Sequence, residues 1–258
     1  MGSAGAHHNW HARGRRQAAR TRTHHLQGRL SGVGQIHPSL PAHAQRGFTL
    51  HPTIWAVVPV KPLRRAKSRL ARALKADQRA ALARSVFART LDVLASVDRI
   101  ERILVMSSDL TVQDIARSKG ALALAESEPG LNVALSQACA FASSRRASGV
   151  LIVPTDLPLL TAHDIESLID LACEPACLVI APDRREEGTN ALLLRPPHVI
   201  QPAFGPSSFE AHQARATIAG IPVHVYRSPT LALDIDGPAD LQYYGELALL
   251  LDAPPLHE

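Results

Sequence analysis

Short runs of branched apolar residues alternate with longer amphipathic segments through most of this chain. Such runs are typical of strands that are buried on both faces of a parallel sheet. The order strand, helix, strand, helix therefore predicts an α/β fold with right-handed crossovers. The runs occupy residues 54–58, 102–106, 121–124 and 150–153, and the predicted helices run from about Asp77 to Val97, over 111–119, over 130–146 and over 162–171.

The pattern changes after residue 177. Two apolar strands, 178–183 and 191–194, are joined by about nine polar residues, which predicts a hairpin whose tip overhangs the strand ends. A short helix carrying His212, a strand at 223–226 and a closing helix at 239–251 complete the order. Residues 231–236 also have the pattern of a strand, in which Asp234 and Asp236 would face the same side.

Composition fits an ordinary globular protein of 258 residues, with 46% hydrophobic, 20% charged and 4% aromatic residues. The chain has no run of apolar residues of the length that a transmembrane helix needs, about 18 or more. Its three cysteines are too few and too irregularly spaced for a disulfide framework or a metal site. We expect reduced thiols and a cytoplasmic protein.

The net charge of +5 comes from the first fifty residues, which hold seven arginines, no lysine and no acid. The remainder carries 21 basic and 23 acidic residues. Residues 1–50 lack apolar periodicity and are predicted to be a disordered basic tail, or an over-long start, before a folded domain at 51–258. Because of this basic tail, a nucleic-acid-binding protein is an alternative function, although the near-neutral charge of residues 51–258 and the few aromatic residues argue against it.

Carboxylates follow two of the predicted strands. Asp156 stands between two prolines after the strand at 150–153, and ligands of open α/β sheets bind beyond such strand ends. It could hold a metal ion against a phosphate, or it could only cap the next helix. Asp234 and Asp236 would repel each other unless a cation or a proton lay between them.

Cations gather in the first strand–helix loop. Lys61, Arg64, Arg65, Lys67 and Arg69 follow the strand end within nine residues, where α/β sheets receive polyphosphates. No Walker motif is present, so side chains rather than glycine backbone would neutralise a phosphate. The alternative is an ordinary solvated basic turn.

Two further turns precede helices. Asn132, after Gly130, could cap its helix or point into the cleft. Gly205 with Ser207 and Ser208 could cradle an anion on free backbone N–H groups, or Ser208 could be a plain N-cap.

Taken together, six blocks in this order resemble the 2-phospho-L-lactate guanylyltransferase family. They are 58–63 with 66–70, 130–132, 155–160, 188–192, 204–209 and 233–238, and the resemblance spans about residues 54–245. Bacterial members are the phosphoenolpyruvate or 3-phospho-D-glycerate guanylyltransferases of coenzyme F(420) biosynthesis. The resemblance implies a GT-A-like (Rossmann-like) nucleotidyltransferase with a mainly parallel sheet and an inserted hairpin region. The family pattern usually has threonine where this chain has Gly237.

What the resemblance implies chemically is transfer of GMP from GTP to a phosphorylated three-carbon acid, with release of pyrophosphate. The acid would be phosphoenolpyruvate or 3-phospho-D-glycerate, with 2-phospho-L-lactate as the less favoured alternative. The implied cofactor is Mg²⁺. The implied catalytic residues are Lys61, Lys67 and Asp156; the nucleotide-binding residues are Pro59, Lys61, Lys67, Arg69, Gly130 and Asn132; the phospho-acid-binding residues are Thr189, Gly205 and Ser208; and the metal ligands are Asp156, Asp234 and Asp236.

The expected partners are GTP, the phospho-acid and a downstream transferase that accepts the unstable guanylylated product, with no membrane and no nucleic acid. A related nucleotidyltransferase with a molybdopterin or sugar-phosphate acceptor is the main alternative. Such enzymes usually carry a glycine-rich first loop, which this chain lacks.

Overall fold

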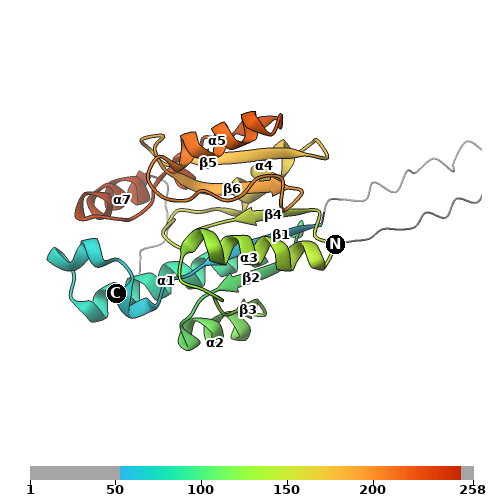
Figure 1. The fold of residues 1–258 in the computed structure, drawn as a ribbon. Coiled ribbons are helices and arrows are strands. Elements are labelled where there is room, and N and C mark those ends of the chain that lie inside the picture. Colours follow the sequence, from blue (N-terminus) through green and yellow to red (C-terminus); the bar gives the residue numbers. More distant parts are fainter. Residues whose placement is uncertain (1–52, 251–258) are drawn as a thin grey trace, which may run out of the picture. The chain divides into compact units, whose positions relative to one another are not determined.

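A seven-stranded sheet forms the centre of the computed structural model, which describes residues 53–250, so the predicted tail at 1–50 lies outside the described residues. The strand order is β3-β2-β1-β4-β6-β5-β7 (Figure 1). The strands are β1 (Ile54–Pro59), β2 (Ile100–Met106), β3 (Leu122–Leu124), β4 (Gly149–Ile152), β5 (Cys177–Pro182), β6 (Thr189–Arg195) and β7 (Val223–Val225).

Most neighbouring strands run parallel. β1 pairs in parallel with β2 and β4, β2 with β3, and β5 with β7. β6 alone is antiparallel to both of its neighbours, β4 and β5. The predicted hairpin is therefore confirmed as β5–β6, and it lies inside the sheet rather than beside it. The predicted fold, a mainly parallel sheet with an inserted hairpin, is correct.

Helices cover both faces of the sheet (Figure 1). In β1, Ile54, Ala56 and Val58 pack toward α1 (Ala76–Ala95), α2 (Leu110–Ser118) and α4 (Ala162–Leu171). Trp55 and Val57 of the same strand pack toward α3 (Leu131–Ser144) and α5 (Ser208–Ile218). Because both faces are buried, the strands read as continuous apolar runs rather than as alternating ones.

The prediction of a strand at 231–236 is wrong. Pro229 begins a short helix, α6 (Pro229–Ala232), at a first-turn position where a missing N–H costs nothing. The chain then continues as an irregular segment, and the backbone N–H of Ile235 donates to the carbonyl of Asp156 instead of to a sheet strand. Buried and exposed residues still alternate in this irregular segment: Leu233 and Ile235 are buried, and Asp234 and Asp236 are half-exposed.

A separate apolar cluster anchors this segment next to the end of β4. Leu233 and Ile235 pack with residues of α1, of the closing helix α7 (Pro238–Leu250) and of the 3-10 helix η2 (Ser68–Arg72), which follows the 3-10 helix η1 (Leu63–Arg65). The first strand–helix loop and the aspartate segment are thus held against each other. No helix of residues 53–250 has the length and apolarity needed to cross a membrane.

Candidate active site

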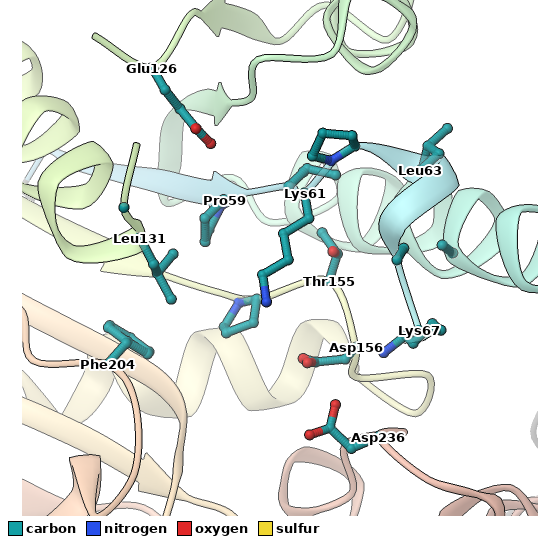
Figure 2. Close-up of a pocket in the computed structure, with 16 residues that line it drawn as sticks. Pro59, Lys61, Leu63, Lys67, Glu126, Leu131, Thr155, Asp156, Phe204 and Asp236 are labelled. Atoms are coloured by element: carbon teal, nitrogen blue, oxygen red, sulfur yellow. The ribbon is translucent and has the colours of Figure 1, made fainter. Parts of the chain in front are cut away.

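A cleft of about 400 Å³ opens where β1 and β4 end. Pro59 ends β1, and Pro154 to Asp156 follow β4 directly, so the cleft lies at the carboxyl edge of the parallel strands, where α/β sheets bind ligands. Six of the predicted site residues line it: Pro59, Lys61, Lys67, Gly130, Asp156 and Asp236 (Figure 2).

Asp156 and the segment 234–236 are joined through the backbone of Ile235. Its N–H donates to the Asp156 carbonyl at 2.9 Å, and its own carbonyl accepts from Lys67 Nζ at 2.7 Å. Lys67 itself has a left-handed backbone, with φ of 53°, which is uncommon for a residue with a side chain. These two bonds fix the carboxylates on either side of Ile235 near Asp156. The alternative that Asp156 caps α4 is wrong, because Thr161 and Asp164 form that cap.

Three carboxylates make up what we call the carboxylate end of the cleft: Asp156, Asp234 and Asp236. Burial raises the pKa of Asp156, the Lys67 charge opposes this rise, and Asp236 adds to it. Burial also raises the pKa of Asp234 to about 6, with a further contribution from the charge of Asp156. Asp156 and Asp234 are thus destabilised in their charged forms by lost hydration and by a neighbouring carboxylate.

Whether this set suits Mg²⁺ can be judged from its chemistry. Within residues 53–250, no group of three or more His, Cys, Asp or Glu side chains is already arranged around a common point for a metal. Mg²⁺ commonly takes only one or two carboxylates, with water and substrate phosphates completing its shell. Hard oxygen donors that repel one another at a strand end fit that requirement, with Asp156 and Asp236 as the pair that lines the cleft.

The five cations of the first loop divide into three groups. Lys61 and Lys67 line the cleft, whereas Arg64 and Arg65 are exposed and do not. Arg69 lies in an adjoining depression of about 330 Å³, where its Nη1 pairs with Asp236 Oδ2 at 2.6 Å. Of the five cations, the two lysines therefore lie in the cleft, whereas Arg69 contacts the carboxylate end.

Asn132 neither caps α3 nor points freely into the cleft. Its Nδ2 donates to the Phe204 carbonyl at 2.9 Å, and its Oδ1 accepts from the Phe204 N–H at 2.8 Å. This pair holds the 204 loop against the first turn of α3. Gly130 precedes that turn with φ of 133°, which a side chain would strain, so its position supports a backbone role.

The predicted phospho-acid residues gather around His212, and we call Thr189, Ser208 and His212 the hydroxyl cluster. His212 is fully buried, and its Nε2 accepts from the Ala203 N–H at 2.9 Å. That nitrogen therefore carries no proton, so the neutral ring is protonated on Nδ1, which donates to Thr189 Oγ1 at 3.1 Å. Among the described residues, the Thr189 hydroxyl makes no other side-chain hydrogen bond, so its hydrogen has no acceptor.

The electrostatics of His212 agree with this assignment. Burial lowers its pKa to about 4, with a smaller contribution from the Arg215 charge, so the ring is neutral at pH 7. Ser208 is buried in the first turn of α5, and its N–H donates to the Gly205 carbonyl at 3.2 Å. Ser207, not Ser208, occupies the N-cap position, and it makes no side-chain cap bond. Thr189 and Ser208 lie together but do not line the 400 Å³ cleft.

Sequence reasoning overlooked three residues that line the cleft. Glu126, Leu131 and Phe204 lie toward one end of it, away from Lys67 and the carboxylates (Figure 2). Their signal was present but weak: an acid stands four residues before Gly130, and Leu131 and Phe204 adjoin turns that were already singled out. Apolar residues beside a turn are more often core, so the pattern did not distinguish them.

An α/β sheet with carboxylates and lysines around one strand-end cleft is the arrangement expected of a nucleotidyltransferase, the class to which the relatives described below belong. Solved structures agree on the fold. A nucleotidyl transferase from Methanothermobacter superposes with a TM-score of 0.58 at 12% identity, covering 77% of this chain and 99% of that one. A CMP:2-keto-3-deoxy-manno-octonic acid synthetase complexed with CTP gives 0.52 at 13% identity, over 77% and 99%.

Sequence comparison identifies the family. Residues 54–249 match the family described as "Guanylyl transferase CofC like", and the chain belongs to it. A phosphoenolpyruvate guanylyltransferase of Sphaerobacter thermophilus is 43% identical over 190 residues, 74% of this chain and 91% of that protein. A 3-phospho-D-glycerate guanylyltransferase of Colwellia psychrerythraea is 35% identical over 202 residues, 78% and 94%.

Proposed function

We propose that this protein transfers GMP from GTP to a phosphorylated three-carbon acid and releases pyrophosphate. Phosphoenolpyruvate and 3-phospho-D-glycerate are the proposed acids, ahead of 2-phospho-L-lactate, and the reaction belongs to coenzyme F(420) biosynthesis. One observation carries the proposal: lysines and carboxylates from distant parts of the chain meet in a single strand-end cleft. The names of the two relatives support the guanylyl group and the two acids.

In the proposed reaction, a phosphate oxygen of the acid attacks the α-phosphorus of GTP in line. The bond from the α-phosphorus to the bridging oxygen of the β-phosphate breaks, and pyrophosphate leaves with that electron pair. Such a transfer needs positioning and neutralisation of charge rather than a protein nucleophile. The cleft has the corresponding parts, cations on one loop and carboxylates facing them.

Each end of the polyphosphate has candidate partners in the proposal. Lys61 and Lys67 line the cleft and would bind the β- and γ-phosphates, with Arg69 joining them after release from Asp236. Asp156 with Asp234 and Asp236 would hold Mg²⁺, which would supply positive charge against the phosphates. Lys67 would also keep its bond to Ile235, so that the lysine and the carboxylates move as one unit.

The acceptor and the nucleoside would occupy the other parts of the site. Thr189 and Ser208, with the backbone of Gly205, would bind the phosphate and carboxylate of the acid. Pro59, Gly130 and Asn132 would shape the nucleoside end. Asn132 would act there through the Phe204 loop that it holds.

The proposal includes a cytoplasmic location and a downstream enzyme. All three cysteines are free thiols, as expected for a reducing compartment. The product joins two phosphates through an anhydride, so a transferase that accepts it directly would limit its hydrolysis.

The test is pyrophosphate release by the full-length protein with Mg²⁺. Each of GTP, ATP, CTP and UTP is combined with phosphoenolpyruvate, 3-phospho-D-glycerate, 2-phospho-L-lactate, a sugar phosphate or molybdopterin. We expect release with GTP and a three-carbon phospho-acid. Lys61→Ala should slow it at least about tenfold, whereas Arg64→Ala, an exposed cation of the same loop, should not. Release only with a sugar phosphate or molybdopterin would refute the proposed acceptor.

A further inference from the structure

Glu126 is an acidic residue that lines the same cleft as Lys61 and Lys67, the lysines that suit phosphates. Its side chain is half-buried and lines the cleft, with the carboxylate directed toward the space beside Pro59 and Lys61 (Figure 2). Among residues 53–250 that carboxylate has no hydrogen bond and no ion pair. A phosphate would be repelled by it, so it must serve a different part of a ligand, one that offers hydrogen-bond donors.

The backbone around Glu126 is held on both sides. Gln137, from α3, accepts from the Ser127 N–H at 3.0 Å through Oε1 and donates to the Ala125 carbonyl at 3.2 Å through Nε2. One side chain therefore fixes the residues immediately before and after Glu126. An acid on a loop fastened in this way is positioned, unlike an acid on a solvated turn.

The surroundings of Glu126 suit a planar ring. Leu131 and Phe204 lie toward the same end of the cleft, and Pro59 forms part of its wall (Figure 2). Apolar walls with one placed polar group are the usual construction of a site for a heteroaromatic ligand. Lys67, Asp156 and Asp236 are at the other end, where a polyphosphate would extend.

Resting on the proposed function, we infer that Glu126 reads the guanine base by accepting hydrogen bonds from its N1–H and N2 amino groups. Guanine presents two adjacent donors on its Watson–Crick edge, which match the two oxygens of a carboxylate. Adenine and cytosine place an acceptor next to their amino group, and that acceptor would face the carboxylate lone pairs. The uracil N3–H is flanked by two carbonyls. Glu126 thus determines specificity rather than the rate of transfer.

The experiment compares nucleotide binding by calorimetry in wild type, Glu126→Gln and Glu128→Gln, all full-length and with Mg²⁺. Glu128 is a matched control, since it is exposed, two residues away and outside the cleft lining. The ligands are GTP, ITP, which lacks the N2 amino group, ATP and dGTP. Wild type and Glu128→Gln should bind GTP about ten- to a hundredfold more tightly than ITP, the usual effect of one charge-assisted hydrogen bond.

In Glu126→Gln, GTP affinity should fall by about the same factor and the preference for GTP over ITP should largely disappear, with an unchanged KM for the phospho-acid. An unchanged GTP-to-ITP ratio would overturn the inference. If the variant instead lost only its preference for GTP over dGTP, the carboxylate would bind the ribose, and base reading would again be overturned. Wild-type protein that bound no nucleoside triphosphate would refute the proposed function as well, so the two failures are distinguishable.

Discussion

The carboxylate end and the hydroxyl cluster solve opposite problems. Asp156, Asp234 and Asp236 are held in place through the backbone of Ile235. Burial raises the pKa of Asp156 and of Asp234 and neighbouring carboxylates add to the rise, whereas Asp236 pairs with Arg69. In the hydroxyl cluster, His212 is neutral, buried and hydrogen-bonded through both ring nitrogens. The first region is fixed in position but electrostatically incomplete, whereas the second is complete except for one hydroxyl hydrogen. Removing a charge should therefore affect turnover in the first region, whereas removing a hydroxyl should affect binding of the acid in the second.

The sharpest way to break this comparison is Asp156→Asn. We expect turnover to fall at least about a hundredfold, because metal stabilisation is worth several kcal/mol, while the free energy of unfolding stays equal or rises. The free energy of unfolding should rise because the substitution removes a poorly hydrated charge that Asp236 repels, and it keeps the backbone carbonyl that accepts from the Ile235 N–H. Steady-state kinetics with urea unfolding checks both parts. If the variant kept more than about a tenth of wild-type turnover, Asp156 would not be a metal ligand.

Lys67→Ala should also be severe, and for two reasons. It removes a cation from the cleft and the bond that holds the carbonyl of Ile235 at 2.7 Å. We expect turnover to fall about ten- to a hundredfold with a small loss of stability, while Arg65→Ala in the same loop should have neither effect. Unchanged turnover and GTP affinity in Lys67→Ala would reduce the loop to a solvated turn.

Thr189→Val and Ser208→Ala test the other region. Each should raise the KM for the phospho-acid about ten- to a hundredfold and leave that for GTP nearly unchanged. His212 offers a matched pair of controls: His212→Asn can still donate to Thr189, and His212→Gln can still accept from the Ala203 N–H. The acid KM should therefore be closer to wild type in the Asn variant. Equal increases in both KM values for Thr189→Val would mean that the cluster shapes the whole cleft.

The smallest effect is the pH dependence of stability, and its sign differs between the two regions. The raised pKa of Asp234 makes the native state bind more protons between 3.8 and about 6, so its contribution falls as pH rises through that window. The lowered pKa of His212 makes the unfolded state bind more protons between about 4 and 6.5, so its contribution falls as pH drops. Each slope is at most about 1.4 kcal/mol per pH unit.

Urea unfolding of the metal-free protein across this range checks both signs. Relative to wild type, His212→Asn should lose stability less steeply on acidification, and Asp234→Asn should lose it more steeply. Parallel curves for the three proteins would show that neither group titrates in the native state as its surroundings require.

Local pattern was enough for most of the fold. Continuous apolar runs identified the strands, and the polar stretch between 183 and 191 identified the hairpin, because both depend on burial that neighbouring residues share. The strand predicted at 231–236 is wrong because buried and exposed residues alternate there through packing against α7 and η2. Packing against a sheet would give the same alternation, so the sequence pattern cannot distinguish the two. Tertiary contacts, not periodicity, decide such short segments.

The sequence predicts which residues lie at the cleft where they directly follow a strand. It does not predict contacts between side chains that are far apart in the chain. The place of Asp156 and Lys61 at the cleft follows from the sequence, because they come directly after β4 and β1. The pattern predicts a phosphate role for Arg69 but gives no sign of its pairing with Asp236, 167 residues away. The sequence does not reveal the place of Glu126 in the cleft, because Gln137 from α3 holds the backbone on both sides of it. Pairings across such distances in the chain have no local signal.

The most direct measurement follows the label from GTP that is labelled either at the α-phosphate or at the γ-phosphate, with Mg²⁺, phosphoenolpyruvate and the full-length protein. If GMP is transferred, the α-label appears in a new guanylylated acid and the γ-label appears only in pyrophosphate. Transfer of the γ-label to the acid, or release of GDP with no labelled acid, would contradict nucleotidyl transfer at this cleft.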